Sequence, residues 1–147
     1  MLPAGVPNAR DASYSGINSA KKAIRHFGDM AKNWDGYGAL RISERTISNA
    51  LVASDILFTT APVPEIAPNP SGTLSFEWET PEGVAYLEVG RTKFSCYIRP
   101  RAGSPVLIDG HVEQLSSYIG LWISSYLYPA NQVTETISRA HFAIDNV

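Results

Sequence analysis

Apolar residues near the N-terminus recur every three or four positions, which is the spacing of an amphipathic helix. This stripe consists of Ile17, Ala20, Ile24, Phe27, Ala31 and Trp34. It predicts a first helix from about residue 16 to residue 32, preceded by an irregular arm over residues 1–14. A second helix is expected to begin after Ser43, whose hydroxyl can accept a hydrogen bond from a free amide of the first turn. It must end before Pro62.

Three later segments alternate apolar and polar residues, which is typical of strands with one buried face. Their apolar positions are Leu74, Phe76 and Trp78, then Ala85, Leu87 and Val89, and finally Phe94, Cys96 and Ile98. These segments predict a three-stranded antiparallel meander. The preceding residues 61–72 hold four prolines and are expected to form a stiff connector. Residues 106–108 are a candidate for a short fourth strand at the edge.

Two turns fix the expected pairing of these strands. One is a four-residue loop over residues 80–83, and the other is a type II′ turn with Gly90 and Arg91 at its centre. Both turns keep the apolar positions on one continuous face. The expected cross-strand partners are Phe76 with Leu87, Ala85 with Cys96, and Glu88 with Lys93.

A third helix is expected between Gly110 and Pro129, where it should cover the apolar face of the sheet. Its buried side would carry Val112, Leu115, Ile119, Trp122, Ile123 and Tyr126. The tail over residues 129–147 has helical spacing, although its Thr and Val content also allows a strand. The sequence therefore predicts one α+β domain over residues 15–128, with two N-terminal helices, the meander and a C-terminal helix packed on the sheet.

Composition narrows the classes of function. The chain has 147 residues, of which 44% are hydrophobic, and its formal net charge is −2. Such a chain can build one core, but it has no global field for holding a polyanion, so general nucleic-acid binding is disfavoured. The single cysteine, Cys96, excludes an intramolecular disulfide and fits a reducing compartment. We see neither a secretory signal nor a bilayer span in the sequence, and we expect a location in the cytoplasm.

The most distinctive string, Asn-Trp-Asp-Gly-Tyr-Gly-Ala, occupies residues 33–39, close to the expected end of the first helix. Two glycines within three residues allow left-handed backbone, and Asp35 can accept hydrogen bonds from nearby amides. The string is interpreted as a corner between two helices, held by Trp34. Because loops often carry function, Asp35 and Tyr37 are also candidates for contact with a partner.

Together with the helix start at Ile42 and Ser43, the proline connector and the Trp-containing segment 72–79, this string resembles a group of short bacterial and phage proteins. Members of the group share a Trp-Asp-Gly-x-Gly-Ala corner, and the resemblance covers residues 31–99, about half the chain. They look like small accessory proteins without an established enzymatic activity. Some sit in short operons reminiscent of toxin–antitoxin or phage–host defence pairs. The resemblance therefore implies an accessory protein that acts on a partner.

The outer side of the third predicted strand gathers basic residues around a tyrosine. The residues that alternate onto this side are Arg91, Lys93, Ser95, Tyr97, Arg99 and Arg101. The pattern fits a ladder of ion pairs with glutamates such as Glu88 on the neighbouring strands. It also fits a protein-binding face that includes Tyr86, or a site for a nucleic-acid backbone.

The third helix carries a stripe of small residues, Ser116, Gly120 and Ser124. Such a stripe lets another helix approach closely, either from the same chain or from a second copy. It is therefore also a candidate for a homodimer contact.

Catalytic and metal-binding patterns are weak. Cys96 points to the expected core, and His26, His111 and His141 lie too far apart in sequence for a metal-ligand motif. The sequence has no Gly-x-Ser-x-Gly elbow. We therefore expect no catalytic residue, cofactor or metal ion.

These observations predict a non-catalytic protein-binding module that neutralises or inhibits a partner protein, in the manner of an antitoxin, an immunity protein or a phage counter-defence (anti-CRISPR-like) inhibitor. If the chain is phage-encoded, the compartment is the host-cell cytoplasm. The alternatives are a nucleic-acid-associated factor that uses residues 91–101, and a small enzyme of unrecognised type. The candidate partner-binding residues are Asp35, Tyr37, Tyr86, Lys93, Tyr97, Arg99 and Arg101.

Overall fold

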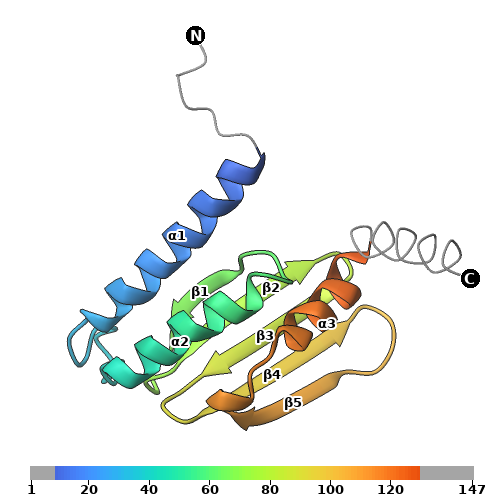
Figure 1. The fold of residues 1–147 in the computed structure, drawn as a ribbon. Coiled ribbons are helices and arrows are strands. Elements are labelled where there is room, and N and C mark those ends of the chain that lie inside the picture. The colour runs from blue at the N-terminus through green and yellow to red at the C-terminus, as the bar shows by residue number, and fades with distance from the viewer. Residues whose placement is uncertain (1–8, 130–147) are drawn as a thin grey trace, which may run out of the picture.

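The structure, a computed structural model, describes residues 9–129, and their side chains from residue 16 onward. Two helices precede the strands and a third follows them (Figure 1). The bounds are Ala9–Gly28 for α1, Glu44–Leu57 for α2, Glu65–Pro68 for β1, Leu74–Thr80 for β2, Gly83–Val89 for β3, Lys93–Pro100 for β4, Val106–His111 for β5, Val112–Gln114 for a 3-10 turn and Ser117–Leu127 for α3. The predicted α+β class is confirmed. The predicted tail over residues 129–147 lies outside the described residues, apart from Pro129.

The strands form one five-stranded sheet in the order β1-β2-β3-β4-β5, in which all neighbours are antiparallel. Helices α2 and α3 lie side by side across one face of this sheet, and α1 lies beyond α2, next to β1 (Figure 1). Within residues 9–129, no helix covers the opposite face. The sheet therefore has one covered face and one open face.

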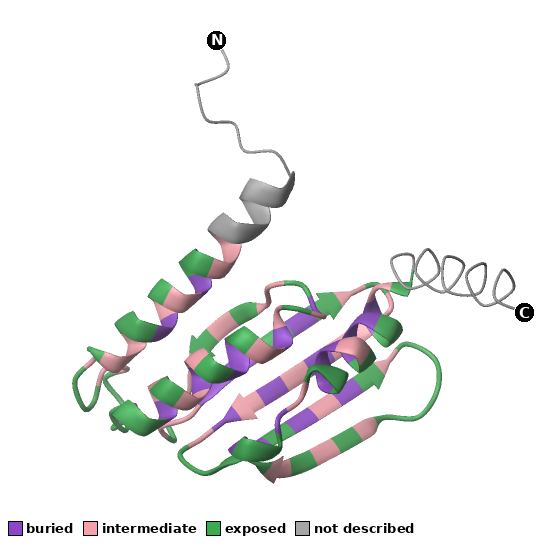
Figure 2. Ribbon diagram, in the orientation of Figure 1, coloured by how far each residue is buried: buried purple, intermediate pink, exposed green. Residues whose placement is uncertain are grey.

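The core lies between the sheet and the two helices, where the buried residues of β2, β3 and β4 gather (Figure 2). Trp78 and Phe76 are its largest side chains, and their rings meet edge to face with centroids 6.4 Å apart. The indole nitrogen of Trp78 donates a hydrogen bond to the carbonyl of Pro62 at 2.6 Å, so this polar group is satisfied. Each fully buried side chain of this size contributes roughly 1.5–3 kcal/mol. The predicted apolar face of the meander is confirmed.

The predicted count of three strands is wrong because an edge strand extends the meander on each side. In β1, Ile66 lies opposite Phe76, within the segment that was expected to be only a proline connector. Proline fixes φ near −65° and lacks an N–H, but both properties are tolerated in the first residue of a strand and in an edge strand. Pro64 and Pro68 therefore frame this strand without preventing it.

The candidate edge strand at residues 106–108 is present as β5 and continues to His111, so the third helix begins later than expected. Gly110 makes this extension possible because it lies opposite Phe94, where a Cβ atom would be 3.1 Å from the aromatic ring. Val112 and Ile119 are buried as predicted. Trp122, which was expected on the buried side, is 45% exposed.

One of the two predicted strand pairings is correct. Phe76 does lie opposite Leu87, but Glu88 lies opposite Ser95 instead of Lys93. Ala85, whose predicted partner was Cys96, lies opposite Ile98. The pairing of β3 with β4 is thus shifted by two residues, and because side chains alternate with a period of two, each residue keeps its face.

The shift arises at the turn between β3 and β4. Gly90 donates its N–H to the carbonyl of Lys93 at 2.9 Å, so the two central residues are Arg91 and Thr92. The side-chain amide of Asn49 in α2 donates to the carbonyls of Gly90 and Arg91. This contact with α2 holds the turn in place, and the local sequence does not reveal it.

Helix α1 differs from its prediction at both ends. It begins at Ala9, inside the segment expected to be an irregular arm, and it ends at Gly28, four residues early. A Cβ atom at Gly28 would lie 3.0 Å from the side chain of Ile47, so this position lets α1 end close against α2. Trp34 therefore lies outside the helix and does not complete its buried stripe.

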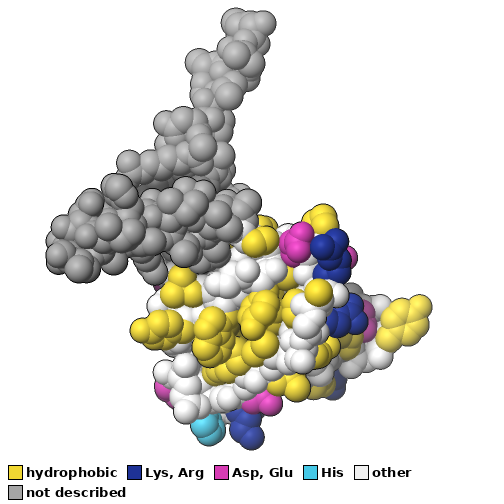
Figure 3. All heavy atoms as spheres, turned by 90° about the vertical axis from the view of Figure 1, so that its right-hand side faces the viewer, with side chains coloured by type: hydrophobic (Ala, Val, Ile, Leu, Met, Phe, Trp, Pro, Cys, Tyr) yellow, Lys and Arg dark blue, Asp and Glu magenta, His cyan; other side chains and the backbone are white. Residues whose placement is uncertain are grey.

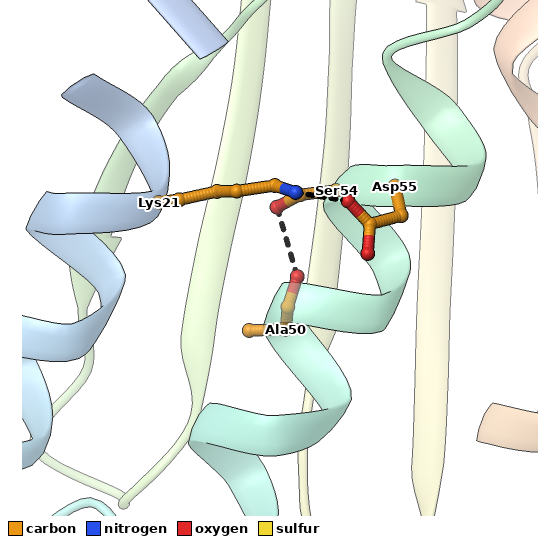
Figure 4. Close-up of polar contacts among 4 residues, drawn as sticks. All are labelled: Lys21, Ala50, Ser54 and Asp55. Atoms are coloured by element: carbon orange, nitrogen blue, oxygen red, sulfur yellow. Dashed lines mark hydrogen bonds and ion pairs between the residues drawn. The ribbon is translucent and has the colours of Figure 1, made fainter. Parts of the chain in front are cut away.

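An ion pair joins the two N-terminal helices. Lys21 of α1 reaches Asp55 of α2, while the neighbouring Ser54 donates its hydroxyl to the carbonyl of Ala50 at 2.9 Å (Figure 4). Ser54 is buried, and this bond satisfies its hydroxyl. The predicted N-cap of α2 is confirmed, since the Ser43 hydroxyl accepts from the amide of Thr46 at 3.2 Å.

The small residues of α3 contact the C-terminal end of α2. A Cβ atom at Gly120 would lie 2.0 Å from the hydroxyl of Thr60 and 3.0 Å from the carbonyl of Leu57. Ser124 donates its hydroxyl to the carbonyl of Thr60 at 2.5 Å. Because Gly120 and Ser124 are buried inside the chain, a homodimer of this fold needs a different surface from the stripe that includes Ser116.

Across residues 9–129, none of the helices combines the length and the apolar character needed to cross a bilayer.

Gly120→Ala tests the close approach of α2 and α3. The added methyl group must displace Thr60 or the backbone of Leu57, so we expect a loss of about 1–3 kcal/mol in the free energy of unfolding. Urea unfolding measures this loss. Ser125→Ala, at an exposed position of the same helix, is the control and should leave stability almost unchanged. Equal stability of both variants would contradict the tight contact.

Candidate functional site

The open face of the sheet carries most of the predicted site residues. Tyr86 of β3 lies opposite Tyr97 of β4, at the centre of a row that crosses all the strands. The members of this row, from β1 to β5, are Glu65, Glu77, Tyr86, Tyr97 and Leu107. The two tyrosines are half-buried against their neighbours, and Leu107 is 69% exposed. The row therefore runs from acidic through aromatic to aliphatic.

Carboxylates gather at the β1–β2 end of the open face. Glu65 lies directly opposite Glu77, and Glu79 is two residues further along β2 on the same face. All three are exposed. Like charges that face each other across two strands are destabilising, and a cationic group from outside would relieve the repulsion. A hollow of about 630 Å³ lies beside these three residues.

Cationic side chains stand on β4, before and after Tyr97. Lys93 and Arg99 are exposed, and neither makes an ion pair with any residue that the structure describes. Arg101 lies just beyond the end of β4 and approaches Glu82 at 4.0 Å. The expected ladder of ion pairs is therefore absent from residues 16–129, and the predicted partner Glu88 accepts a hydrogen bond from Thr73 instead.

A chain of polar side chains holds Tyr86 in position. Its hydroxyl and that of Ser75 are 2.5 Å apart, and Ser75 in turn accepts from the amide of Asn69 at 2.6 Å. Thr73 receives a second bond from Asn69 and donates to Glu88 at 2.6 Å. These bonds join the β1–β2 turn to β3. Tyr86, at the centre of the open face, is thus held in place by bonds within the chain.

A second hollow, of about 610 Å³, lies at the end of the open face near the β3–β4 turn. Its polar lining includes Glu88, Lys93, Ser95, Asp109 and His111. Charges of both signs alternate around it, which suits recognition of another polar surface more than capture of one type of ion. In the part of the chain that the structure describes, no three His, Cys, Asp or Glu side chains are grouped to hold a metal ion.

The corner at residues 33–39 is built by local hydrogen bonds. Asp35 accepts from the amides of Tyr37 at 2.8 Å and Ala39 at 3.0 Å, while Asn33 accepts from the amide of Gly38 at 2.6 Å. Asn33, Gly36 and Gly38 all have positive φ, as expected for left-handed backbone.

Asp35 accepts hydrogen bonds from nearby amides as predicted, whereas the role of Trp34 differs from its prediction. Trp34 is only half-buried and donates to the carbonyl of Leu40 at 3.0 Å, so it fastens the loop to itself. The amide of Leu40 donates to the carbonyl of Pro70 at 2.8 Å, which attaches the corner to the β1–β2 turn. Asp35 is engaged in holding the loop, and Tyr37 is 93% exposed.

The predicted site residues therefore fall into separate places. Tyr86, Lys93, Tyr97 and Arg99 share the open face, and Arg101 follows at its margin. Asp35 and Tyr37 lie apart from these residues, in the loop between α1 and α2.

Sequence reasoning missed two residues of the central row on the open face, Glu65 and Leu107. Glu65 was overlooked because prolines on both sides masked β1, although alternation with Ile66 is present. Leu107 was placed in a possible strand, but the pairing of that strand with β4 was not known. In both cases the alternation of apolar and polar residues was the available signal. Only the pairing with a neighbouring strand shows which face of the sheet a residue lies on.

Cys96 is buried on the covered face of the sheet, as predicted. Burial, with a smaller contribution from the charge of Asp109, raises the pKa of its thiol to about 12. A thiol with such a pKa is almost entirely protonated near neutral pH, and the thiolate is the nucleophilic form. The arrangement around Cys96 is that of an inert core residue.

Comparison with known proteins adds no relative, because no family model, curated protein or solved structure matches the chain.

Asp35→Ala tests whether the corner depends on its own hydrogen bonds. Two amides lose their acceptor, so we expect a loss of about 1–2 kcal/mol in the free energy of unfolding. Tyr37→Ala is the matched control in the same loop and should have little effect, since the side chain is 93% exposed. Chemical denaturation of both variants provides the comparison, and an unaffected Asp35→Ala protein would show that the loop is held otherwise.

The reactivity of Cys96 tests its burial. Because its pKa is raised to about 12, we expect negligible alkylation by iodoacetamide at pH 8 in the folded protein and complete alkylation in urea. Mass spectrometry after a timed reaction gives the modified fraction. Rapid modification of the folded protein would contradict the inert assignment.

Proposed function

We propose that this protein is a non-catalytic protein-binding module that uses the open face of its sheet to hold and inhibit a partner protein. The observation that carries this proposal is the arrangement of the face itself. Tyr86, held by Ser75, and its cross-strand neighbour Tyr97 lie beside exposed carboxylates on β1 and β2, and the β4 cations that flank Tyr97 make no ion pair within the described residues. Interfaces between proteins are enriched in tyrosine and arginine at their centres.

Electrostatics favours a partner with charges of both signs. The carboxylates Glu65, Glu77 and Glu79 repel one another, whereas Lys93 and Arg99 form no ion pair in the described part of the chain. A partner that places basic residues over β2 and acidic residues over β4 reduces the repulsion among the carboxylates and also provides ion pairs for the cations. Complementary charge of this kind mainly speeds association and selects the partner.

The same charges disfavour a nucleic acid. A phosphate backbone that approached Arg99 would also meet Glu79, because Arg99 lies opposite Val84 and Val84 lies opposite Glu79. Binding to a polyanion requires cations without such neighbours along its path. The nucleic-acid function therefore ranks second, and the experiment below distinguishes it.

Several further points belong to this proposal. The resemblance of residues 31–99 to short accessory proteins of bacteria and phages supports a role in neutralising a partner, as antitoxins, immunity proteins and phage counter-defence inhibitors do. A buried, protonated Cys96 supports a non-catalytic role for the one cysteine. We assign the protein to the cytoplasm, that of the host cell if the chain is phage-encoded, because a single cysteine fits a reducing compartment.

The test is affinity capture from a lysate of the native host, with nuclease and a salt series, followed by mass spectrometry. We expect one stoichiometric protein that survives nuclease and high salt. The double variant Tyr97→Ala, Arg99→Glu should weaken its binding by at least about 30-fold, the effect of removing roughly 2 kcal/mol at the centre of an interface.

The matched control is Tyr37→Ala, Arg41→Glu, which makes the same chemical changes at exposed positions of the α1–α2 loop. It should bind like the original protein, and circular dichroism should be unchanged in both double variants. Loss of binding in the control alone would move the interface to the corner. Capture that disappears with nuclease would favour the nucleic-acid function.

A further inference from the structure

The outer edge of the sheet at β5 is unpaired within the described residues, since β5 pairs only with β4. The amide of Val112 donates to the carbonyl of Thr92 at 2.9 Å, which fixes the alternation of hydrogen bonds along this pair of strands. In an antiparallel pair, every second residue directs both backbone groups toward its partner. Val106, Ile108 and Gly110 therefore bond to β4, and Leu107 and Asp109 direct their N–H and C=O groups outward.

The two edges of the sheet differ in how they are protected. The β1 edge is short, follows Pro64, ends at Pro68, and lies next to α1. Prolines and short edge strands are common means of preventing sheets from joining. The outward groups of β5, at Leu107 and Asp109, have no proline among them and no covering element within residues 9–129.

Apolar side chains surround the open edge. Tyr118, Trp122 and Tyr126 stand four residues apart on the side of α3 that faces away from α2, and they are 66%, 45% and 41% exposed. This is the side of β5, because α2 and α3 cover the sheet in that order. Leu107 is exposed on the other face of the same edge. Figure 3, which views the molecule from this side, shows hydrophobic side chains gathered on the surface.

We propose that this edge binds a second copy of the chain, through antiparallel pairing of β5 with β5 about a two-fold axis at Ile108. Leu107 of one copy then lies opposite Asp109 of the second copy, and each residue uses both of its outward backbone groups. Ile108 meets Ile108 of the second copy on the covered side of the sheet. The pairing is self-complementary, as a two-fold contact between identical surfaces requires.

Both ends of the new ladder are closed by residues of this chain. The next pair would join Pro105 to His111 of the second copy. Pro105 has no N–H to donate, and the amide of His111 already donates to the side chain of Gln114 at 2.8 Å. The free N–H groups of the edge are therefore those of Leu107 and Asp109. They are sufficient for the proposed pairing, and a longer ladder would lack donors.

The apolar area reaches the lower limit for a specific dimer interface. A whole aromatic side chain buries roughly 150–250 Å², so the exposed parts of Tyr118, Trp122 and Tyr126 offer roughly 200–400 Å² in each copy. Two copies, with Leu107 and the paired strands, reach on the order of the 1,000–1,200 Å² that a specific interface needs. The dimer goes beyond the proposed function, because it joins two open faces into one continuous surface and presents two partner-binding sites on the same side.

Sedimentation velocity of the full chain over a concentration series tests this dimer. Leu107→Pro removes one outward N–H without removing a bond to β4, whereas Leu107→Ala shortens the side chain and keeps the backbone donor. We expect a dimer for the original protein, a dissociation constant raised at least tenfold by Leu107→Pro, and a smaller change for Leu107→Ala. A monomer at all concentrations, or equal effects of the two substitutions, would overturn the proposal.

Hydrogen exchange of the unsubstituted protein provides a second test that no folding defect can affect. The amides of Leu107 and Asp109 should become protected as the concentration rises, and those of Ile108 and Gly110 should be protected throughout. Rapid exchange of Leu107 and Asp109 at every concentration would contradict the pairing. Protection that does not depend on concentration would mean that another segment of the same chain occupies the edge, and it would also overturn the proposal.

Discussion

Burial of one face of the sheet under α2 and α3 is the interaction on which the rest of this structure depends. The alternation along β2, β3 and β4 supplies a single apolar face, with Trp78 and Phe76 at its centre. Two helices suffice to cover that face because Gly120 lets them lie in close contact. The opposite face of the sheet is left to polar and aromatic residues, and it is this face that is available to a partner.

Strand alternation and helix periodicity predicted the covered face, the three helices and the N-cap at Ser43, because each of these depends on neighbouring residues in the chain. The pairing of β3 with β4 was not predictable in the same way. The turn between these strands is bonded by Asn49, a residue of α2 more than forty positions away. Helix α1 likewise ends where its contact with Ile47 requires, and the local stripe through Trp34 continues past that point.

The candidate site was only partly predicted, because strand pairing depends on residues that are distant in the chain. Alternation placed Tyr97 and Arg99 on one side of a strand, but the charges that face them depend on which strands are neighbours. Once the strands are paired, Glu65, Glu77 and Glu79 lie on β1 and β2 while Lys93 and Arg99 lie on β4, with no ion-pair ladder between them in the described residues. The polar network at Tyr86 adds rigidity that no sequence pattern indicates, since it joins a turn to a strand. A rigid, charged face with an aromatic centre is suited to a partner protein, because little conformational entropy is lost when it binds.

The most direct measurement of the central claim is hydroxyl-radical footprinting of the protein alone and saturated with its captured partner. This method reports the solvent exposure of side chains, so it distinguishes the open face from the α1–α2 loop within one experiment. We expect Tyr86 and Tyr97 to lose reactivity in the complex and Tyr37 to keep it. Undiminished reactivity of Tyr86 and Tyr97 in a saturated complex would contradict the account and place the interface elsewhere.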